Sequence, residues 1–229
     1  MDTDSENKKF AIKDQVTNTF SQIVFDENKR RSLDISREVF NSAYLTECDR
    51  RILYRARGEQ ALKHSEFSII DGRDSTKNKW STFFSKSLKI NLLEKDLLVA
   101  DCNYNITGII DSVIKIGNAV FVVMIKDLSS KEFSRVEKRA FRKDIVETMI
   151  NMWLSEIQNG ILLYENRDTG VFSAYHIIPY VQIIEACKNK CLKMVGLKIK
   201  GGLPEKPYKN NEEKECQMCE FQTKCWEIK

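Results

Sequence analysis

Residues 105–128 read NITGIIDSVIKIGNAVFVVMIKDL, and this stretch decides the expected fold class. It contains two runs rich in β-branched residues, which are joined by Gly117 and Asn118. A two-residue connection of this composition is typical of a β-hairpin. Upstream of about Leu97 the apolar residues follow a helical period, so we expect the sheet to begin near that residue.

The register of this hairpin places polar residues on one face. If Ile116 pairs with Ala119, antiparallel counting sets Asp111 against Met124. Lys126 then shares the face of Met124, because alternate residues of a strand point to the same side. Isoleucines and valines flank Asp111, so a position on a bare solvent face is unexpected. Met124 is expected to fill the core.

Helical patterns surround this hairpin, and a second hairpin follows it. The sequence predicts a peripheral helix over residues 12–24, a helix over 36–58 that contains Cys48, and helices over 80–88, 136–160 and 181–199. Residues 160–180 predict the second hairpin. We therefore expect an α/β protein: a flexible start with a peripheral helix in residues 1–30, then one domain over residues 31–229.

Composition describes a folded protein without a strong bias in charge. Of 229 residues, 42% are hydrophobic and 31% charged, which excludes a low-complexity chain. The formal net charge of +4 does not by itself demand a polyanionic partner, so a nucleic-acid surface would be a local stripe. The N-terminus is acidic and polar and no stretch reaches 18 apolar residues, so we expect a cytoplasmic protein without a membrane partner.

The seven cysteines point to a metal or cluster site. An odd number excludes complete disulfide pairing within one chain, and a reducing compartment disfavours such pairing. Cys216, Cys219 and Cys225 fall within ten positions, so three thiolates can surround one centre, with a fourth ligand from elsewhere. A structural zinc site and a cysteine-rich surface tail are the alternatives that this spacing leaves open.

Several stretches resemble one family together: CDRRILYRARG at 48–58, ITGIIDSVI at 106–114, VVMIKDLSS at 122–130, GILLYENRDTG at 160–170 and the terminal cysteine run. The chain resembles the RecB-like, CRISPR-associated exonucleases with a 4Fe–4S cluster, of the PD-(D/E)XK superfamily, and especially versions from viruses of bacteria. The resemblance implies a restriction-endonuclease-like mixed sheet flanked by helices, in the cytoplasm of a bacterium or a virus-infected host cell. It also implies that Cys48 joins Cys216, Cys219 and Cys225 as the fourth cluster ligand, with residues 203–229 as the cluster segment.

The same resemblance implies a degenerate catalytic site. The family has one metal-binding aspartate, matched by Asp111, and then Glu-x-Lys, in which Lys126 matches the lysine and Met124 replaces the glutamate. A thioether cannot replace carboxylate oxygen around Mg²⁺ or Mn²⁺, so we expect the site to be degenerate. The alternative is a relocated carboxylate, Glu147, although the helical wheel places Glu147 on a solvated surface. The family histidine falls at Thr76, beside Lys77.

Basic residues suggest where a nucleic acid would bind. Arginines spaced along helices can follow phosphates, and an aromatic residue such as Trp80 could stack on bases. The candidates are Arg50, Arg51, Arg55, Arg139 and Arg142. We therefore expect a single-stranded DNA-binding relative of the family. The alternatives are an active Mg²⁺- or Mn²⁺-dependent single-stranded DNA exonuclease and a non-catalytic subunit that docks on protein partners in a larger assembly.

Overall fold

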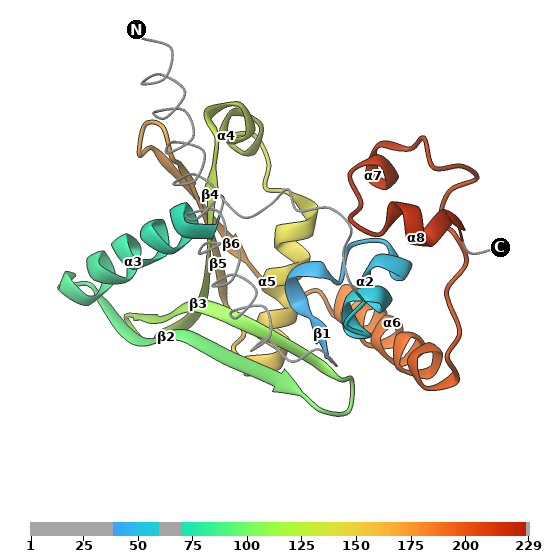
Figure 1. Cartoon of the computed structure of the whole chain (residues 1–229). Coiled ribbons are helices and arrows are strands. Elements are labelled where there is room, and N and C mark those ends of the chain that lie inside the picture. Colours follow the sequence, from blue (N-terminus) through green and yellow to red (C-terminus); the bar gives the residue numbers. More distant parts are fainter. Residues whose placement is uncertain (1–38, 60–69, 228–229) are drawn as a thin grey trace, which may run out of the picture.

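The sheet of this protein has six strands and mixed strand directions (Figure 1). A computed structural model describes residues 39–59 and 70–227, so the helix expected over 12–24 lies outside the described residues. The strands are β1 (Phe40–Asn41), β2 (Ile90–Asp101), β3 (Ile106–Ile116), β4 (Ala119–Leu128), β5 (Gly160–Asn166) and β6 (Phe172–Ile177). Their order is β1-β3-β4-β5-β6, with β2 paired to β3 off this path. The expected α/β class is therefore confirmed.

The register of the β3–β4 hairpin is confirmed up to the candidate site. Ile116 pairs with Ala119 and Lys115 with Val120, but the ladder ends at Ser112 and Val123. At its other end β3 pairs in parallel with β1 through residues 106–107, while β2 follows β3 along nearly its whole length. Residues 108–111 of β3 therefore pair with neither β1 nor β4 along this edge, and the sheet splits here between β1 and β4. The sheet also begins earlier than Leu97: β1 starts at Phe40, and β2 starts at Ile90 and forms a long ladder with β3.

Two helix predictions are corrected. The helix expected over 36–58 is interrupted: β1 is followed by a short 3₁₀ helix, η1 (Ser42–Tyr44), and by α2 (Asp49–Ala56). Cys48 therefore precedes α2 as its N-cap residue and does not lie inside a helix. The helix expected over 136–160 is two helices, α4 (Ser130–Val136) and α5 (Arg142–Ser155), because a capping box at Ser129 starts α4 early and Glu156 ends α5 in the left-handed conformation.

The remaining helices are α3 (Ile70–Lys86), α6 (Val181–Lys200), α7 (Lys214–Gln217) and α8 (Gln222–Glu227). The helix expected over 80–88 is confirmed within α3, the helix over 181–199 is α6, and the second hairpin is β5–β6. Figure 1 shows α7 and α8 beside α2, at the other end of the molecule from α3. Within the described ranges, no helix combines the length and the apolar character that crossing a membrane requires.

The core lies on both faces of the sheet. On one face Val122 and Met124 pack with residues of α5, including Met149. On the other face Val123 and Ile125 pack with residues that include Phe84 of α3. Alternate residues of β4 therefore supply the two cores, as the period of a strand requires. A third cluster joins α2, α5 and α6 through residues that include Leu53, Ile150 and Met194.

Candidate functional site

Asp111 lies at the split of the sheet and is fully engaged by its neighbours. Its side chain is 2% exposed. One carboxylate oxygen accepts a hydrogen bond from the backbone N–H of Ile125 at 2.6 Å, and the other lies 2.6 Å from Nζ of Lys77 on α3. Burial raises the pKa of Asp111, and Lys77 offsets part of that rise. Both oxygens that could bind a metal therefore have a partner within the protein.

Lys126 and Glu147 form a second ion pair beside Asp111. Nζ of Lys126 lies 2.6 Å from a carboxylate oxygen of Glu147. Glu147 is buried at 8% exposure, so its expected position on a solvated surface is wrong. Positions 146–152 of α5 are all buried, because the helix packs between the sheet, η1 and α6. Burial acts to lower the pKa of Lys126, but Glu147 and Asp144 outweigh it and the pKa is raised.

Met124 lies beside these ion pairs and fills the core as expected. Its side chain is 2% exposed, and its sulfur accepts a hydrogen bond of 3.3 Å from the amide of Asn151 on α5. Asn151 Oδ1 is buried and accepts no hydrogen bond from any described residue. A Cβ added to Gly108 would lie 1.9 Å from this oxygen, so glycine is required for the close approach of β3 and α5.

A buried hydrogen-bond network fixes the start of α5 against the sheet. The hydroxyl of Tyr164 on β5 donates to Asp144 at 2.8 Å and accepts from the backbone N–H of Phe141 at 3.0 Å. Burial, followed by the Asp144 charge, raises the pKa of Tyr164 far above its ordinary value. The hydroxyl therefore stays protonated and holds the first turn of α5, which in turn positions Glu147.

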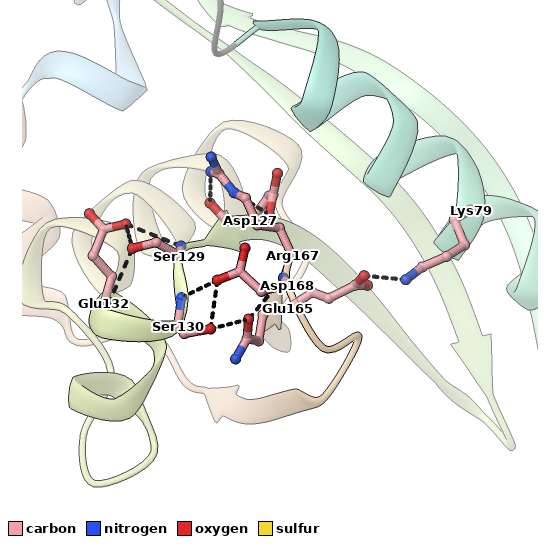
Figure 2. A network of polar contacts seen from close by, with 9 residues as sticks. Lys79, Asp127, Ser129, Ser130, Glu132, Glu165, Arg167 and Asp168 are labelled. Carbon is pink, nitrogen blue, oxygen red and sulfur yellow. Dashed lines mark hydrogen bonds and ion pairs between the residues drawn. The ribbon is translucent and has the colours of Figure 1, made fainter.

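A further polar network lies at the carboxyl ends of β4 and β5. Figure 2 shows Lys79 of α3 reaching Glu165, near the ion pair of Asp127 and Arg167. The indole N–H of Trp80 also donates to Glu165, at 2.5 Å. Glu165 is 5% exposed, so this buried carboxylate has both a cationic and a neutral partner. The network connects α3 to the end of the sheet that adjoins Asp111 and Lys126.

The residues of this site do not fit a Mg²⁺ or Mn²⁺ ion as the fold family would hold it. Such ions require several oxygen ligands. Asp111 is paired with Lys77, Glu147 with Lys126, and the third position is a thioether. Throughout residues 39–59 and 70–227, no group of three His, Cys, Asp or Glu side chains is arranged to hold a metal ion. As arranged, the site can neutralise its carboxylates without a divalent ion.

The four cysteines of the expected cluster lie near one another at the C-terminal end. Cys48 precedes α2, Cys216 lies in α7, Cys219 follows α7 and Cys225 lies in α8. Burial raises the pKa of the Cys216 thiol, and the charges of Cys48 and Cys225 add to the rise. Burial also raises the pKa of Cys219, and the charges of Glu220 and then Cys48 add to the rise, while the backbone of Phe221 and Arg51 act to lower it. The tertiary structure therefore brings Cys48 to the terminal cysteine run.

The other cysteines are placed as core or turn residues. Cys187 and Cys191 are buried one turn apart on α6, as expected for small apolar groups. Burial raises the pKa of Cys191 to about 12. Cys102 is exposed in the turn between β2 and β3. Among the described residues, no contact places any of these three cysteines beside the C-terminal cysteines, Cys216, Cys219 and Cys225.

The candidate arginines fall into two groups. Arg50 donates to the backbone oxygen of Pro204 at 2.7 Å and lies 3.6 Å from the sulfur of Cys225. Arg51 and Arg55 both pair with Glu220, each at 2.6 Å. These three arginines therefore bind the C-terminal segment of the protein itself. Arg139 and Arg142, in contrast, are exposed at the start of α5 and in the preceding loop.

Two parts of the site were not anticipated from the sequence. Lys77, and not Thr76, contacts Asp111; Thr76 is buried. A lysine on the helix before the hairpin was the only available signal, and one lysine among 37 basic residues is weak. The Tyr164–Asp144 pair joins residues 20 apart in sequence, and no local pattern predicts it.

The sheet order, the split beside Asp111 and the helices on both faces define a nuclease-like fold. No family model matches the sequence, and no curated protein does either. Among solved structures, the chain is similar to SSO0001 with a TM-score of 0.60 at 16% identity, over 91% of this chain and 97% of that chain. A mixed sheet of this kind was expected, and this part of the prediction is confirmed.

An alkaline exonuclease, LHK-Exo from Laribacter hongkongensis, has a similar fold. The TM-score is 0.59 at 9% identity, over 75% of this chain and 93% of that chain. The same enzyme in complex with dAMP gives a TM-score of 0.56 at 8% identity, over 72% of this chain and 90% of that chain. At these identities the likeness shows the fold alone.

Proposed function

We propose that this protein is a nuclease-fold protein that binds single-stranded DNA and has replaced its catalytic metal site by internal ion pairs. The observation that carries the proposal is the ion pair of Lys77 with Asp111, the residue that matches the metal-binding aspartate of the family. The exonuclease neighbours support a function on nucleic acid. The expected degeneracy of the site rests on Met124 and on this pair together.

The two lysines supply the positive charge that a divalent ion would otherwise supply. Lys77 neutralises Asp111 and Lys126 neutralises Glu147, so two ammonium groups face two carboxylates. An ammonium group is a fixed donor and cannot lower the pKa of a bound water as a metal does. A site neutralised in this way can retain its fold without activating water for phosphodiester hydrolysis.

The alternative function is an active exonuclease with a relocated carboxylate. The observation that favours it is the burial of Glu147 beside Lys126 and Asp111, which brings a second carboxylate to the site. For a metal to bind both carboxylates, Lys77 would have to leave Asp111. The two functions therefore differ in whether Lys77 stays in place when Mg²⁺ or Mn²⁺ is added.

A nuclease assay separates the two functions. Labelled single-stranded DNA is incubated with anaerobically purified protein and Mg²⁺ or Mn²⁺, and no degradation is expected. Lys77→Ala combined with Met124→Glu should gain Mn²⁺ binding, measured by calorimetry, because an oxygen ligand appears and the competing ammonium is removed. Met218→Glu, at a methionine that is 71% exposed, is the matched control. Degradation by the wild type that Asp111→Ala abolishes would establish the exonuclease instead.

A binding assay tests the nucleic-acid function and the structural-subunit alternative. Fluorescence polarisation with single-stranded DNA over a salt series should give a steep negative slope. Arg139→Ala with Arg142→Ala should reduce the magnitude of that slope by about 1.4, since each lost phosphate contact on single strands removes about 0.7. Lys193→Ala, at an exposed position of α6, should leave the slope unchanged. A wild type without measurable binding would favour a docking subunit.

We also propose that Cys48, Cys216, Cys219 and Cys225 hold a 4Fe–4S cluster, as in the iron–sulfur branch that the sequence resembles. Four thiolates are the usual ligands of such a cluster, and the four thiols would have to move closer together to hold it, because the described side chains form no group arranged to hold a metal ion. The guanidinium of Arg50 lies beside the Cys225 sulfur, and the indole of Trp226 acts to lower the pKa of Cys216. The cluster would tie α2 to the C-terminal segment and so stabilise both.

Iron and sulfide analysis tests the cluster. Anaerobically purified wild type should contain iron and sulfide in equal amounts and absorb in the visible range. Cys225→Ala should lose this absorbance and lower the melting temperature, because α2 and α8 are no longer tied together. Cys102→Ala removes an exposed cysteine in a turn and is the matched control. Zinc as the only bound metal would contradict the cluster.

A further inference from the structure

One side of α3 carries an alternation of basic and aromatic side chains. Lys79, Phe83 and Lys86 follow one another at spacings of four and three residues, so they form a single stripe along the helix. Residues 75–86 contain three lysines and no acidic residue. The stripe therefore places an aromatic ring between two ammonium groups, of which Lys79 is paired with Glu165 and Lys86 is exposed.

Three aromatic rings from two elements form a continuous surface at this stripe. The Trp80 ring packs edge-on against Phe83, with 5.7 Å between centroids, and against Phe172 of β6, with 5.0 Å between centroids. Phe83 is 53% exposed and Phe172 is 56% exposed. Large apolar rings that remain this exposed beside one another mark a binding surface more than a core.

The central ring of this surface is held rigidly. Trp80 donates its indole N–H to Glu165 at 2.5 Å, and its ring also packs on the buried Phe84. Figure 2 shows Lys79 binding the same carboxylate from α3. An aromatic surface with a fixed centre loses little conformational entropy when a planar ligand stacks on it.

The aromatic surface adjoins the candidate site through α3 itself. Lys77, which pairs with Asp111, lies three residues before Trp80, which corresponds to about 4.5 Å along the helix axis. Ser81 of the same helix contacts Ser112 of β3 at 3.2 Å. A chain that lay along α3 would therefore pass close to Lys77, which contacts the buried Asp111 at the split of the sheet.

We infer that Phe83, Trp80 and Phe172 form a platform on which the bases of single-stranded DNA stack, with Lys79 and Lys86 along its backbone. Bases offer flat apolar faces and the backbone offers regularly spaced negative charge, and this surface presents the complement of both. A purely apolar protein partner would not use the lysines. The inference rests on the proposed nucleic-acid function and assigns the place where the strand binds.

The test compares normal and abasic single-stranded oligonucleotides of equal length by fluorescence polarisation. Wild type should bind the normal strand about tenfold more tightly, because the abasic strand keeps its phosphates but has no bases to stack. Phe83→Leu combined with Phe172→Leu should remove this preference and leave the salt slope unchanged. Lys86→Ala should instead reduce the magnitude of the salt slope by about 0.7 and keep the preference.

Matched controls make the outcomes distinct. Tyr180→Leu removes another aromatic ring that is 54% exposed, before α6, and should change neither measurement. Thermal melting of the double variant should match wild type, since both rings lie at the surface. Wild type that binds DNA without preferring bases, or a double variant that binds like wild type, would overturn the platform alone. Wild type that binds neither strand would overturn the proposed function as well.

Discussion

Asp111 of β3 and Glu147 of α5 each have a lysine partner from another element, whereas the charged neighbours of the Cys216 thiol include Cys48 and Cys225. At the sheet, each buried carboxylate is therefore neutralised by the protein itself. At the cysteines, burial is the main cause that raises the pKa of Cys216 and Cys219, so the thiol form is favoured there. The two regions therefore differ: the carboxylates of the sheet site have cationic partners within the protein, whereas burial favours the uncharged thiols of Cys216 and Cys219.

The largest expected effect comes from breaking an ion pair on the sheet. Glu147→Ala leaves Lys126 without its partner and should lower the free energy of unfolding by about 2–3 kcal/mol. This is below the full value for a buried pair, because the Lys126 side chain remains 24% exposed. Denaturant unfolding measures it. Glu185→Ala, which breaks an exposed pair with Lys188 on α6, is the matched control and should cost less than about 0.5 kcal/mol.

A double variant sharpens the interpretation of that result. Lys126→Met with Glu147→Leu removes both charges and should recover most of the lost stability, since an apolar pair of similar volume replaces a buried ion pair at little cost. If the single and double variants were equally unstable, the packing of α5 and not the ion pair would account for the loss. The charge pairing of Lys126 with Glu147 would then not be what stabilises this site.

The next effect tests the close approach of β3 and α5 beside the site. Gly108→Ala should lower the free energy of unfolding by about 2 kcal/mol, because the new Cβ would clash with Asn151. Gly196→Ala is the control, since the position in α6 has open space, and it should raise stability by about 0.5–1 kcal/mol. Thermal and denaturant unfolding measure both. If Gly108→Ala raised the stability as much as Gly196→Ala does, this result would show that Asn151 can move freely away from the new Cβ.

The smallest effect is a pH dependence at the cysteine end. Burial acts to raise the pKa of Glu220, but Arg51 and Arg55 outweigh it, so its pKa in the folded protein lies below the ordinary value. A depressed folded-state pKa contributes stability above the ordinary glutamate pKa, and this stability is lost as the pH falls through the folded-state value. We therefore expect the C-terminal segment to loosen in acid, with a contribution of about 1 kcal/mol.

Limited proteolysis at decreasing pH measures this loosening. Wild type should become sensitive in residues 203–227 as the pH falls through the acid range, whereas Glu220→Gln should be equally sensitive at all these pH values. Glu185→Gln changes an exposed glutamate on α6 and should behave like wild type. A wild type that stays protected in acid would show that other contacts, such as Arg50 with Pro204, hold the segment.

Local patterns predicted the two hairpins well, but they missed β1, which lies in a stretch expected as a helix, and the early start of β2. Gly117 and Asn118 fixed the β3–β4 register, because a two-residue turn leaves one way to count partners. Helix boundaries were predicted less well: the break around Cys48 and the gap between α4 and α5 depend on capping and on contacts with β3 and Tyr164. Those contacts join distant segments and leave no local signal.

The sequence by itself determined the sheet hairpins, a methionine two residues before Lys126 and the spacing of the terminal cysteines. Only the tertiary structure decided that Lys77 pairs with Asp111, that Glu147 is buried and that Arg50, Arg51 and Arg55 bind the C-terminal segment. The physical reason is the distance along the chain over which each kind of interaction acts. Backbone preference and side-chain period act over a few neighbouring residues, whereas ion pairs and burial depend on which distant elements the folded sheet brings together.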